Sequence, residues 1–246
     1  MASIRSLGGI IVATLALISS TTALPHPQED AECGPAYVKV RDPPTFSNGS
    51  TPIGWTPPPT GWIFKPWHQV ITSSAQTAQL RNFQWDPTPI DPAVPEGPVN
   101  DLSSFQIPGS DTVYTSYGVA TPNPNYIAVM DYRGTGILEN ATSQYSWLGW
   151  GCDGNQNPYY LTYATAAEAS GTPAAIDFMS TVDTGLDEDT KNAVIAALKQ
   201  SKNEEIRKIA DSFLSNVQDG GRRDLGRVPE CDDDCKTNKD LIGIIG

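Results

Sequence analysis

The stretch from Tyr126 to Lys199 decides the fold of this chain, because it alternates aromatic segments with turns and then changes to a helical pattern. Its four apolar segments read NYIAVMDYRGTGI (125–137), SQYSWLGWGCDG (143–154), NPYYLTYATA (157–166) and AAIDFMST (174–181). Glycine- and asparagine-containing turns separate them, which is typical of successive antiparallel strands. The segment LDEDTKNAVIAALKQ (186–200) follows with apolar residues at helical spacing. This order predicts the closing half of an antiparallel barrel with a helix on its wall.

Side chains alternate between the two faces of a strand, so the segments predict which residues lie together. In the third segment Tyr159, Leu161 and Tyr163 face opposite to Tyr160 and Thr162. The same rule places Ile176 and Phe178 opposite Asp177 and Met179, and Tyr145 and Trp147 opposite Leu148 and Trp150. Because apolar side chains occupy both faces, we expect a mainly β fold, a barrel whose inner face lines a core or cavity and whose outer face is partly covered.

The segments around this stretch complete the expected architecture. Residues 24–59 are expected to form a proline-rich lead-in, since proline lacks the N–H that a strand ladder needs. The barrel domain is expected over 60–200, and a helix and an acidic, cysteine-containing tail over 201–246. Further strands are expected at Trp62–Phe64, His68–Thr72, Leu80–Trp85, Leu102–Ile107, Thr112–Val119 and Tyr126–Tyr132, a loop at Asp86–Pro98, and helices from Asp187 and over Glu204–Val217.

The first residues predict a secretory signal peptide over 1–23. Arg5 precedes an apolar run from Leu7 to Ile18, and small residues ending at Ala23 follow. The alternative is a membrane anchor, but the run is shorter than the roughly 20 residues needed to span a bilayer. We therefore expect a secreted protein.

The chain is strongly acidic. Its formal net charge is −12, and removal of Arg5 with the signal would make it −13. Such a chain repels phosphate backbones and anionic lipid surfaces. We therefore expect neither nucleic acid nor a membrane as a partner.

Four cysteines, an even number, predict two disulfides in a secreted chain. Three pairings are possible. Cys231 and Cys235 either close a local loop or connect the tail to Cys33 and Cys152. We favour the second arrangement, because it would tether an otherwise loose tail. No histidine lies near these cysteines, so we expect no zinc site.

Two glycosylation sequons are present, Asn48-Gly-Ser and Asn140-Ala-Thr. Both lie in segments that we expect to be exposed. In a secreted chain both are therefore expected acceptors.

Six motifs follow one another along the chain: Gly61-Trp62, YRGTG (132–136), YSWLGWG (145–151), YYLTYA (159–164), TPAAIDFMST (172–181) and GLDEDT (185–190). Together they resemble the lipocalin-like (calycin) secreted proteins of filamentous fungi, over about Gly61 to Gln200. The resemblance implies an eight-stranded antiparallel β-barrel with C-terminal helices and a pocket for a small hydrophobic molecule at its mouth. Gly61 and Trp62 are adjacent here, whereas the lipocalin entrance signature has a residue between them.

The aromatic side chains suit such a pocket, because Trp and Tyr offer stacking faces with polar tips. The alternative is that they fill the core or plug the ends of the barrel. The expected ligand-binding residues are Trp62, Trp67, Tyr117, Tyr132, Arg133, Trp147, Trp150 and Tyr160.

Few residues are candidates for catalysis. His26 lies in the lead-in, so a histidine-dependent reaction would need His68. Asp131 and Asp177 are strand carboxylates with a default outward orientation; inside the barrel, burial would raise the pKa of either and make it an acid or base. The sequence has no Gly-x-Ser-x-Gly motif, phosphate loop or metal-ligand cluster, so we expect no cofactor and no metal.

Three functions remain open. We favour a secreted, monomeric carrier of a small hydrophobic molecule. One alternative is an isomerase or cyclase of fungal secondary metabolism, in which the barrel would fold a flexible substrate into a reactive shape. The other is a secreted protein that acts through surface contacts. An inward-facing ionisable residue would favour the enzyme, an apolar cavity the carrier, and a filled barrel the surface contacts.

Overall fold

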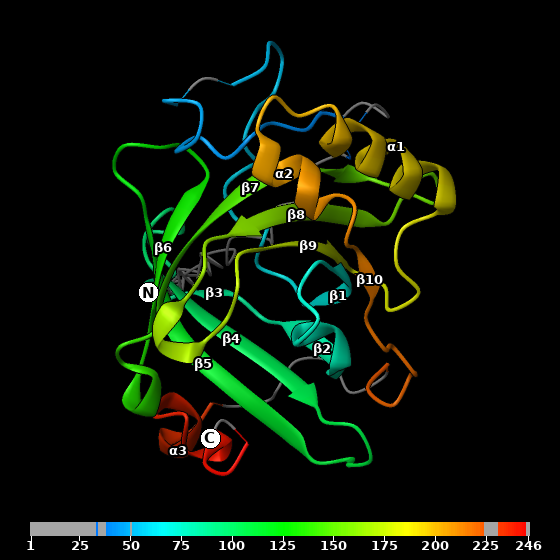
Figure 1. Cartoon of the computed structure of the whole chain (residues 1–246). Helices are drawn as coiled ribbons and strands as arrows, with labels where there is room; N and C mark the ends of the chain where they lie inside the picture. The colour runs from blue at the N-terminus through cyan, green and yellow to red at the C-terminus, as the bar shows by residue number, and fades with distance from the viewer. Residues whose placement is uncertain (1–32, 34–37, 50, 224–230, 245–246) are drawn as a thin grey trace, which may run out of the picture. The chain divides into compact units, whose positions relative to one another are not determined.

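Eight antiparallel strands, each paired with the next along the chain, form a closed barrel in the computed structural model (Figure 1). The structure describes residues 33, 38–49, 51–223 and 231–244. β9 pairs with β1 and closes the barrel. The predicted fold class, a mainly β antiparallel barrel with C-terminal helices, is confirmed. The barrel strands are β1 (Trp67–Thr72), β2 (Arg81–Trp85), β4 (Val99–Gln106), β5 (Val113–Pro122), β6 (Val129–Gly134), β7 (Thr142–Cys152), β8 (Pro158–Ala164) and β9 (Ala175–Ser180).

Short elements extend this barrel. Two additional strands are β3 (Thr88–Pro89), which pairs with β4, and β10 (Leu214–Ser215), which pairs with β1. None of the helices in the described ranges is both long and apolar enough to cross a membrane. The helices are α1 (Glu188–Lys199), α2 (Glu204–Ile209) and α3 (Asp233–Lys236), with 3₁₀ turns at Thr77–Gln79, Gly136–Leu138, Glu168–Ser170 and Lys239–Leu241.

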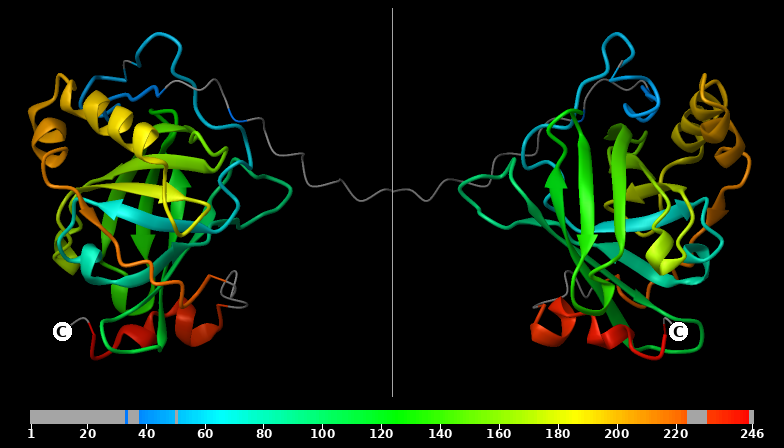
Figure 2. Two further views of the ribbon diagram at one scale, coloured as in Figure 1. Left: turned by 90° about the vertical axis from the view of Figure 1, so that its right-hand side faces the viewer. Right: turned by 60° about the vertical axis from the view of Figure 1, so that its left-hand side comes forward.

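Helices α1 and α2 cover the outer face of β7, β8 and β9 (Figures 1 and 2). Val194 and Leu198 of α1 and Ile206 of α2 are fully buried there against Leu161 and Phe178. Apolar residues at i and i+4 lie on one face of a helix, which explains why the predicted stripe of α1 faces the barrel. We call this layer the outer core.

The side-chain alternation predicted for β8 and β9 is confirmed, but that of β7 changes at a bulge. The register with β8 shifts between Trp147 and Gly149, so β7 carries one extra residue there. Leu148 therefore packs in the outer core, whereas Trp150 packs against the inner one. The prediction that these two residues share a face is wrong, because a bulge reverses the alternation beyond it.

The strand predicted at Trp62–Phe64 is wrong. The backbone N–H of Trp62 donates to the Pro59 carbonyl, and that of Phe64 donates to the Gly61 carbonyl. Gly61 has a positive φ of 80°, which a glycine adopts without steric cost. This segment consists of tight turns that precede β1.

The strand predicted from Tyr126 begins later, at Val129. The Asn123 side chain accepts hydrogen bonds from the backbone N–H groups of Asn125 and Tyr126, which holds a local turn. Ala128 has a positive φ of 52°, so extended backbone starts only after it.

The helix predicted over Glu204–Val217 ends at Ile209, and the chain then joins the sheet. β1 and β2 pair over two residues only and then diverge. Segment 214–219 lies in this gap, where the sheet satisfies its backbone hydrogen bonds. Its contacts include hydrogen bonds from Asn216 N–H to the Val70 carbonyl, from Asn82 N–H to the Val217 carbonyl and from the Gln218 side chain to the Gln69 carbonyl.

The acidic tail is docked, and the prediction of a loose tail is wrong for residues 231–244. Asn238 is fully buried against the outer face of β5. Its side chain accepts from the Tyr117 N–H at 2.7 Å and donates to the Tyr117 and Thr135 carbonyls at 2.8 Å. Figure 2 shows α3 beside the barrel, on the side away from α1 and α2.

The two disulfides are Cys33–Cys152 and Cys231–Cys235, with Cα–Cα distances of 5.2 Å. The presence of two disulfides is confirmed, but our preference for bridges from the tail to the body is wrong. Hydrogen bonds of Asn238 anchor the tail instead, so its cysteines are left to pair locally.

Candidate functional site

Aromatic side chains fill the middle of the barrel and form what we call the aromatic partition: Trp62, Trp67, Trp85, Tyr145, Trp147 and Tyr160. The ring centroids of their contacting pairs lie 4.6–6.4 Å apart, in edge-on or tilted arrangements. Trp67 is fully buried and donates its ring N–H to the Ile63 carbonyl at 2.8 Å. Separate cavities border the partition at Tyr145 and at Trp147, whose rings are neighbours.

The first of these, the interior cavity, has a volume of about 140 Å³. It lies on the side of the partition toward Ala164, the last residue of β8. Every lining residue belongs to a barrel strand, so the wall is part of the sheet itself. Its polar lining includes Gln69, Asp101, Ser103, Thr162 and Asp177.

Asp101 of β4 is one of two carboxyl groups at this cavity. Its Oδ1 accepts a hydrogen bond from the ring N–H of Trp85 at 2.9 Å. Burial raises the pKa of Asp101 to about 6, although the Trp85 donor and the nearby Tyr145 hydroxyl oppose this increase. The Tyr145 hydroxyl itself makes no well-formed hydrogen bond within the described part of the chain.

Asp177 of β9 is the second carboxyl group. Burial raises the pKa of Asp177 to about 6, and the side chains of Thr72 and Gln69 lower it in part. Its Oδ1 has no hydrogen-bond partner among the described residues. A buried carboxyl oxygen without a donor favours the protonated, neutral form.

Tyr160 links the two carboxyl groups electrostatically. Burial raises the pKa of Tyr160 well above its usual value, and the charges of Asp101 and Asp177 raise it further. Tyr160 is therefore a phenol, and a hydrogen-bond donor, at any physiological pH. A carboxyl group with a pKa near 6 exists in both protonation states around neutral pH. The carboxyl groups of the interior cavity can thus donate and accept protons.

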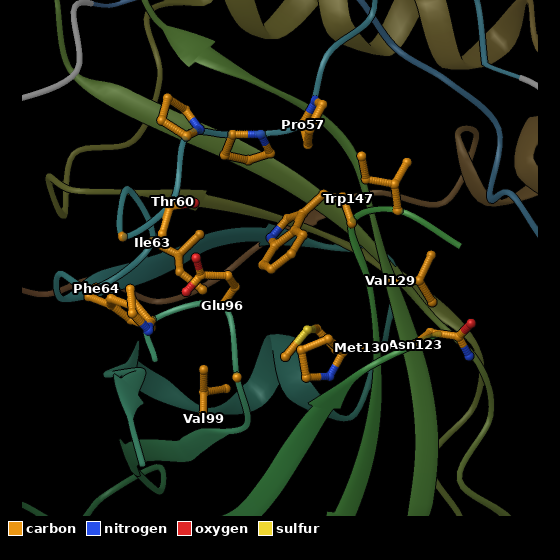
Figure 3. A pocket seen from close by; sticks show the side chains of 18 of the residues that line it. Pro57, Thr60, Ile63, Phe64, Glu96, Val99, Asn123, Val129, Met130 and Trp147 are labelled. Carbon is orange, nitrogen blue, oxygen red and sulfur yellow. The ribbon is translucent and has the colours of Figure 1, made fainter. Parts of the chain in front are cut away.

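The second space, the mouth pocket, lies at the opposite end of the barrel and has a volume of about 320 Å³ (Figure 3). Turns of segment 57–64, of the β2–β4 link and of the β5–β6 link form its rim. The inner-face residues Val99, Met130 and Trp147 line its depth. This pocket is mostly apolar, as sites for small organic molecules usually are.

The structure places one of the three predicted catalytic residues, Asp177, at the interior cavity. His68 alternates with the inward-facing Trp67 and Gln69 and therefore lies on the outer face of β1, where burial lowers its pKa. Asp131 lies on the outer face of β6 and accepts hydrogen bonds from the side chains of Asn123 and Gln144. These three residues are not brought together.

The predicted ligand-binding residues divide between the two faces of the wall. Tyr117 and Arg133 are on the outer face, Tyr117 beneath the docked tail and Arg133 exposed. Trp67 is sealed in the core with none of its surface exposed. The residues on the inner face are Trp62, Trp67, Tyr132, Trp147, Trp150 and Tyr160.

Sequence reasoning did not identify Asp101, Trp85 or Tyr145 as site residues. A usable signal for the first was the alternation of Val99, Asp101 and Ser103 along β4, which puts the carboxylate on the same face as an apolar residue. Nothing local distinguishes that face as the inner one. It becomes the inner face only through pairing with β5.

The predicted glycosylation sites lie on the surface of the described part of the chain. The side chains of Asn48 and Asn140 are exposed, and their glycosylation stays a prediction. Within the described ranges, no group of three His, Cys, Asp or Glu side chains is placed to hold a metal ion. The predicted signal peptide, residues 1–23, lies outside the described residues.

No family model matches this chain. It is 27% identical over 212 residues to Botcinic acid biosynthesis cluster B protein 12 of Botryotinia fuckeliana, which covers 84% of this chain and 94% of that protein.

Solved structures that align with the chain include H1 crustacyanin from the lobster Homarus americanus (14% identity, 75% of this chain and 92% of that one, TM-score 0.44). They also include insecticyanin from the tobacco hornworm Manduca sexta (14%, 77% and 88%, TM-score 0.41). A third is the amine-binding protein of Rhodnius prolixus (12%, 72% and 94%, TM-score 0.44).

Proposed function

We propose that this protein binds a small, largely apolar molecule in the interior cavity and serves a biosynthetic pathway of secondary metabolism. The observation that carries this proposal is a cavity inside a closed barrel, walled by aromatic rings and containing two carboxyl groups. A cavity of about 150 Å³ accommodates one benzene-sized molecule. The interior cavity therefore suits a ring, or one end of a longer molecule.

The polar lining favours a ligand that is neutral and carries a hydroxyl or carbonyl group. An anionic ligand would have to lie beside Asp101 and Asp177 in a chain of net charge −12. The oxygen of a neutral hydroxyl or carbonyl group, in contrast, accepts a hydrogen bond from a protonated carboxyl group or a tyrosine hydroxyl. The biosynthetic setting is supported by the name of the Botryotinia fuckeliana protein, which matches across most of both chains.

The test is native mass spectrometry of the protein purified from its own source, with extraction of any bound molecule. Ala164→Phe would fill the interior cavity from its wall, and Ala196→Phe on the exposed face of α1 is the matched control. We expect a stoichiometric neutral metabolite with the native protein and with Ala196→Phe, and none with Ala164→Phe. If no metabolite is bound and neither toluene nor 4-methylphenol enters, the proposal is wrong.

A second candidate is an isomerase or cyclase that transfers protons within the same cavity. It is favoured by the two carboxyl groups with raised pKa values, since an acid or base is most effective when its pKa is near the working pH. Incubating a precursor of the bound metabolite with native protein, Asp101→Asn and Asp177→Asn distinguishes the two functions. If the native protein converts the precursor, and both variants lose this activity while they still bind the product, the protein is an enzyme. If the native protein does not convert the precursor either, the carrier function stands.

A further inference from the structure

We propose that the mouth pocket is a second binding site, which takes a neutral apolar molecule through a single hydroxyl group. This site is separate from the interior cavity, because the two share no lining residue and the aromatic partition lies between them. The proposal therefore does not rest on the function proposed above. The volume of the mouth pocket, about 320 Å³, falls at the lower end of the range of typical small-molecule sites.

The rim of the pocket is rigid before any ligand arrives. Pro57, Pro58 and Pro59 form one side, Pro95 contributes from the β2–β4 link, and Pro122 contributes from the end of β5. Proline fixes its own φ angle, so these walls lose little conformational entropy on binding. A preformed pocket of this kind loses less binding free energy to the ordering of its own side chains and loops.

The buried guanidinium of Arg41 fixes the wall of the pocket from behind. Its Nε donates to the Trp147 carbonyl at 2.8 Å, and its Nη2 donates to the Ile127 and Ala128 carbonyls at 2.9 and 2.8 Å. The same guanidinium stacks on the Trp55 ring at 3.8 Å. These contacts join the start of β6 to the bulge of β7 and so fix the position of Trp147.

Trp147 provides a hydrogen-bond donor that has no acceptor. Its side chain is 7% exposed, and its ring N–H has no partner among the described residues. Figure 3 shows the ring reaching into the pocket with its nitrogen on the side of Glu96. A buried N–H without a partner costs free energy that a ligand acceptor would recover.

Glu96 provides the complementary acceptor. It projects into the same space from the β2–β4 link, and within the described residues no cation pairs with it (Figure 3). The lining has three further polar side chains, Thr60, Asn123 and Tyr126. Asn123 is already occupied, because its amide donates to Asp131 and its oxygen accepts from the backbone N–H groups of Asn125 and Tyr126. The indole N–H of Trp147 is therefore a buried donor without an acceptor among the described residues, and Glu96 is the carboxylate that lines the same, mostly apolar space.

A hydroxyl group suits both partners, because its oxygen can accept from an indole N–H and its proton can be donated to a carboxylate. A ketone would satisfy Trp147 only, and an ammonium group Glu96 only. A carboxylate would be repelled by Glu96 and by the negative charge of the chain. Hydrogen bonds to charged groups are stronger than neutral ones, so the Glu96 contact should contribute most to affinity.

The experiment uses one rigid cage with four different groups: 1-adamantanol, 2-adamantanone, 1-adamantylamine and adamantane-1-carboxylate, titrated calorimetrically at pH 7.5. We expect the alcohol to bind about tenfold more tightly than the ketone, the gain of one charge-assisted hydrogen bond, and the carboxylate to bind most weakly. Glu96→Met should lower the affinity for the alcohol about tenfold and leave the ketone unchanged. Trp147→Phe should weaken both.

Matched variants locate the site. Glu139→Met changes an exposed glutamate elsewhere on the surface and should alter nothing. Ala164→Phe fills the interior cavity and should leave binding of the alcohol unchanged. Glu96 is exposed, so its substitution does not threaten folding.

Three results would overturn the proposal. In the first, the alcohol binds no better than the ketone, or Glu96→Met has no effect. In the second, the amine binds most tightly and loses affinity in Glu96→Met, which would make the pocket a cation site. In the third, Ala164→Phe abolishes binding of the alcohol; the ligand would then occupy the interior cavity, and the function proposed above would stand without a second site.

Discussion

The two cavities of this barrel share strands but differ in chemistry. β4 contributes Val99 to the mouth pocket and Asp101 to the interior cavity, and β7 contributes Trp147 to the first and Tyr145 to the second. A step of two residues along one strand thus leads from an apolar pocket to a space with carboxyl groups. The end of the barrel that a position faces, more than its strand of origin, determines the chemistry that the position can offer.

The walls of the two cavities also differ. Strand side chains make the whole wall of the interior cavity, whereas three turns make the rim of the mouth pocket. A change of size in a packed wall forces neighbouring side chains out of their preferred rotamers, and a turn tolerates it more easily. Substitutions should therefore alter the selectivity of the mouth pocket at little cost in stability, and that of the interior cavity at a larger one.

The largest effect on stability is expected from removing one ring of the aromatic partition that separates the two cavities. Trp67→Ala deletes a fully buried side chain and should lower the free energy of unfolding by about 3 to 5 kcal/mol. Urea unfolding followed by circular dichroism measures this. Trp150→Ala, which removes a half-buried ring at the edge of the same cluster, is the control and should cost less. Equal effects would mean that the partition is not a packed core.

Asp177→Asn tests the buried carboxyl group of the interior cavity. The folded protein keeps this proton up to about pH 6, whereas the unfolded chain releases it near pH 3.8. Because the folded state holds more protons between these values, the Asp177 contribution to stability falls as pH rises from 4 to 6. The variant should therefore be more stable than the native protein by about 1 to 3 kcal/mol at pH 7, and equally stable at pH 4.

The matched carboxylate of the mouth pocket should behave differently. Glu96 is exposed to solvent, so Glu96→Gln should change the free energy of unfolding by less than about 0.5 kcal/mol at either pH. Unfolding curves of both variants at pH 4 and pH 7 make the comparison. If Asp177→Asn changed the free energy of unfolding equally at pH 4 and pH 7, the Asp177 carboxyl group would be in contact with bulk water.

The pH dependence of binding should also separate the cavities. A neutral ligand in the interior cavity displaces water from Asp101 and Asp177, which favours their protonated forms. Its affinity should rise about tenfold between pH 8 and pH 5, which corresponds to about one unit of further pKa increase. Titration with 4-methylphenol across this range measures the effect, with uptake of protons on binding as an independent readout. Affinity that falls toward pH 5 would contradict the assignment.

A small effect is expected from Tyr145→Phe. The hydroxyl is buried without a well-formed hydrogen bond, so its loss should be neutral or stabilise the protein by up to about 1 kcal/mol. The hydroxyl lowers the pKa of Asp101, so that pKa should rise in the variant. Carboxyl chemical shifts followed against pH measure this. A marked loss of stability would indicate a hydrogen bond that tightens in solution.

Much of the barrel could be predicted from sequence, because alternation and turn residues act locally. The faces of Tyr159 and Tyr160 in β8, and of Ile176 and Asp177 in β9, followed from spacing alone. The bulge at Leu148 could not be predicted, since an extra residue leaves no mark on the alternation before it. Beyond such a point every face assignment is reversed.

The site was less predictable than the fold. Asp177 was a catalytic candidate whose default orientation was outward, whereas the structure places it at the interior cavity. Its partner Asp101 was not a candidate at all, because closure of the barrel brings distant strands together. The cysteine pairing failed for a related reason: a buried amide, Asn238, fixes the tail, and no sequence pattern marks an asparagine as buried. Interactions between distant segments decided both outcomes.

The gap between β1 and β2 imposes an order on events during translation. Asn82 accepts its hydrogen bond from the backbone N–H of Asp219, 137 residues later in the chain. At roughly 5–20 residues per second, ribosomes need on the order of ten seconds to supply that partner. During this time the nascent chain exposes an unpaired strand edge, which is a template for association with other chains. Chains that terminate before Leu214 would keep that edge permanently, so premature termination should yield aggregates instead of shorter barrels.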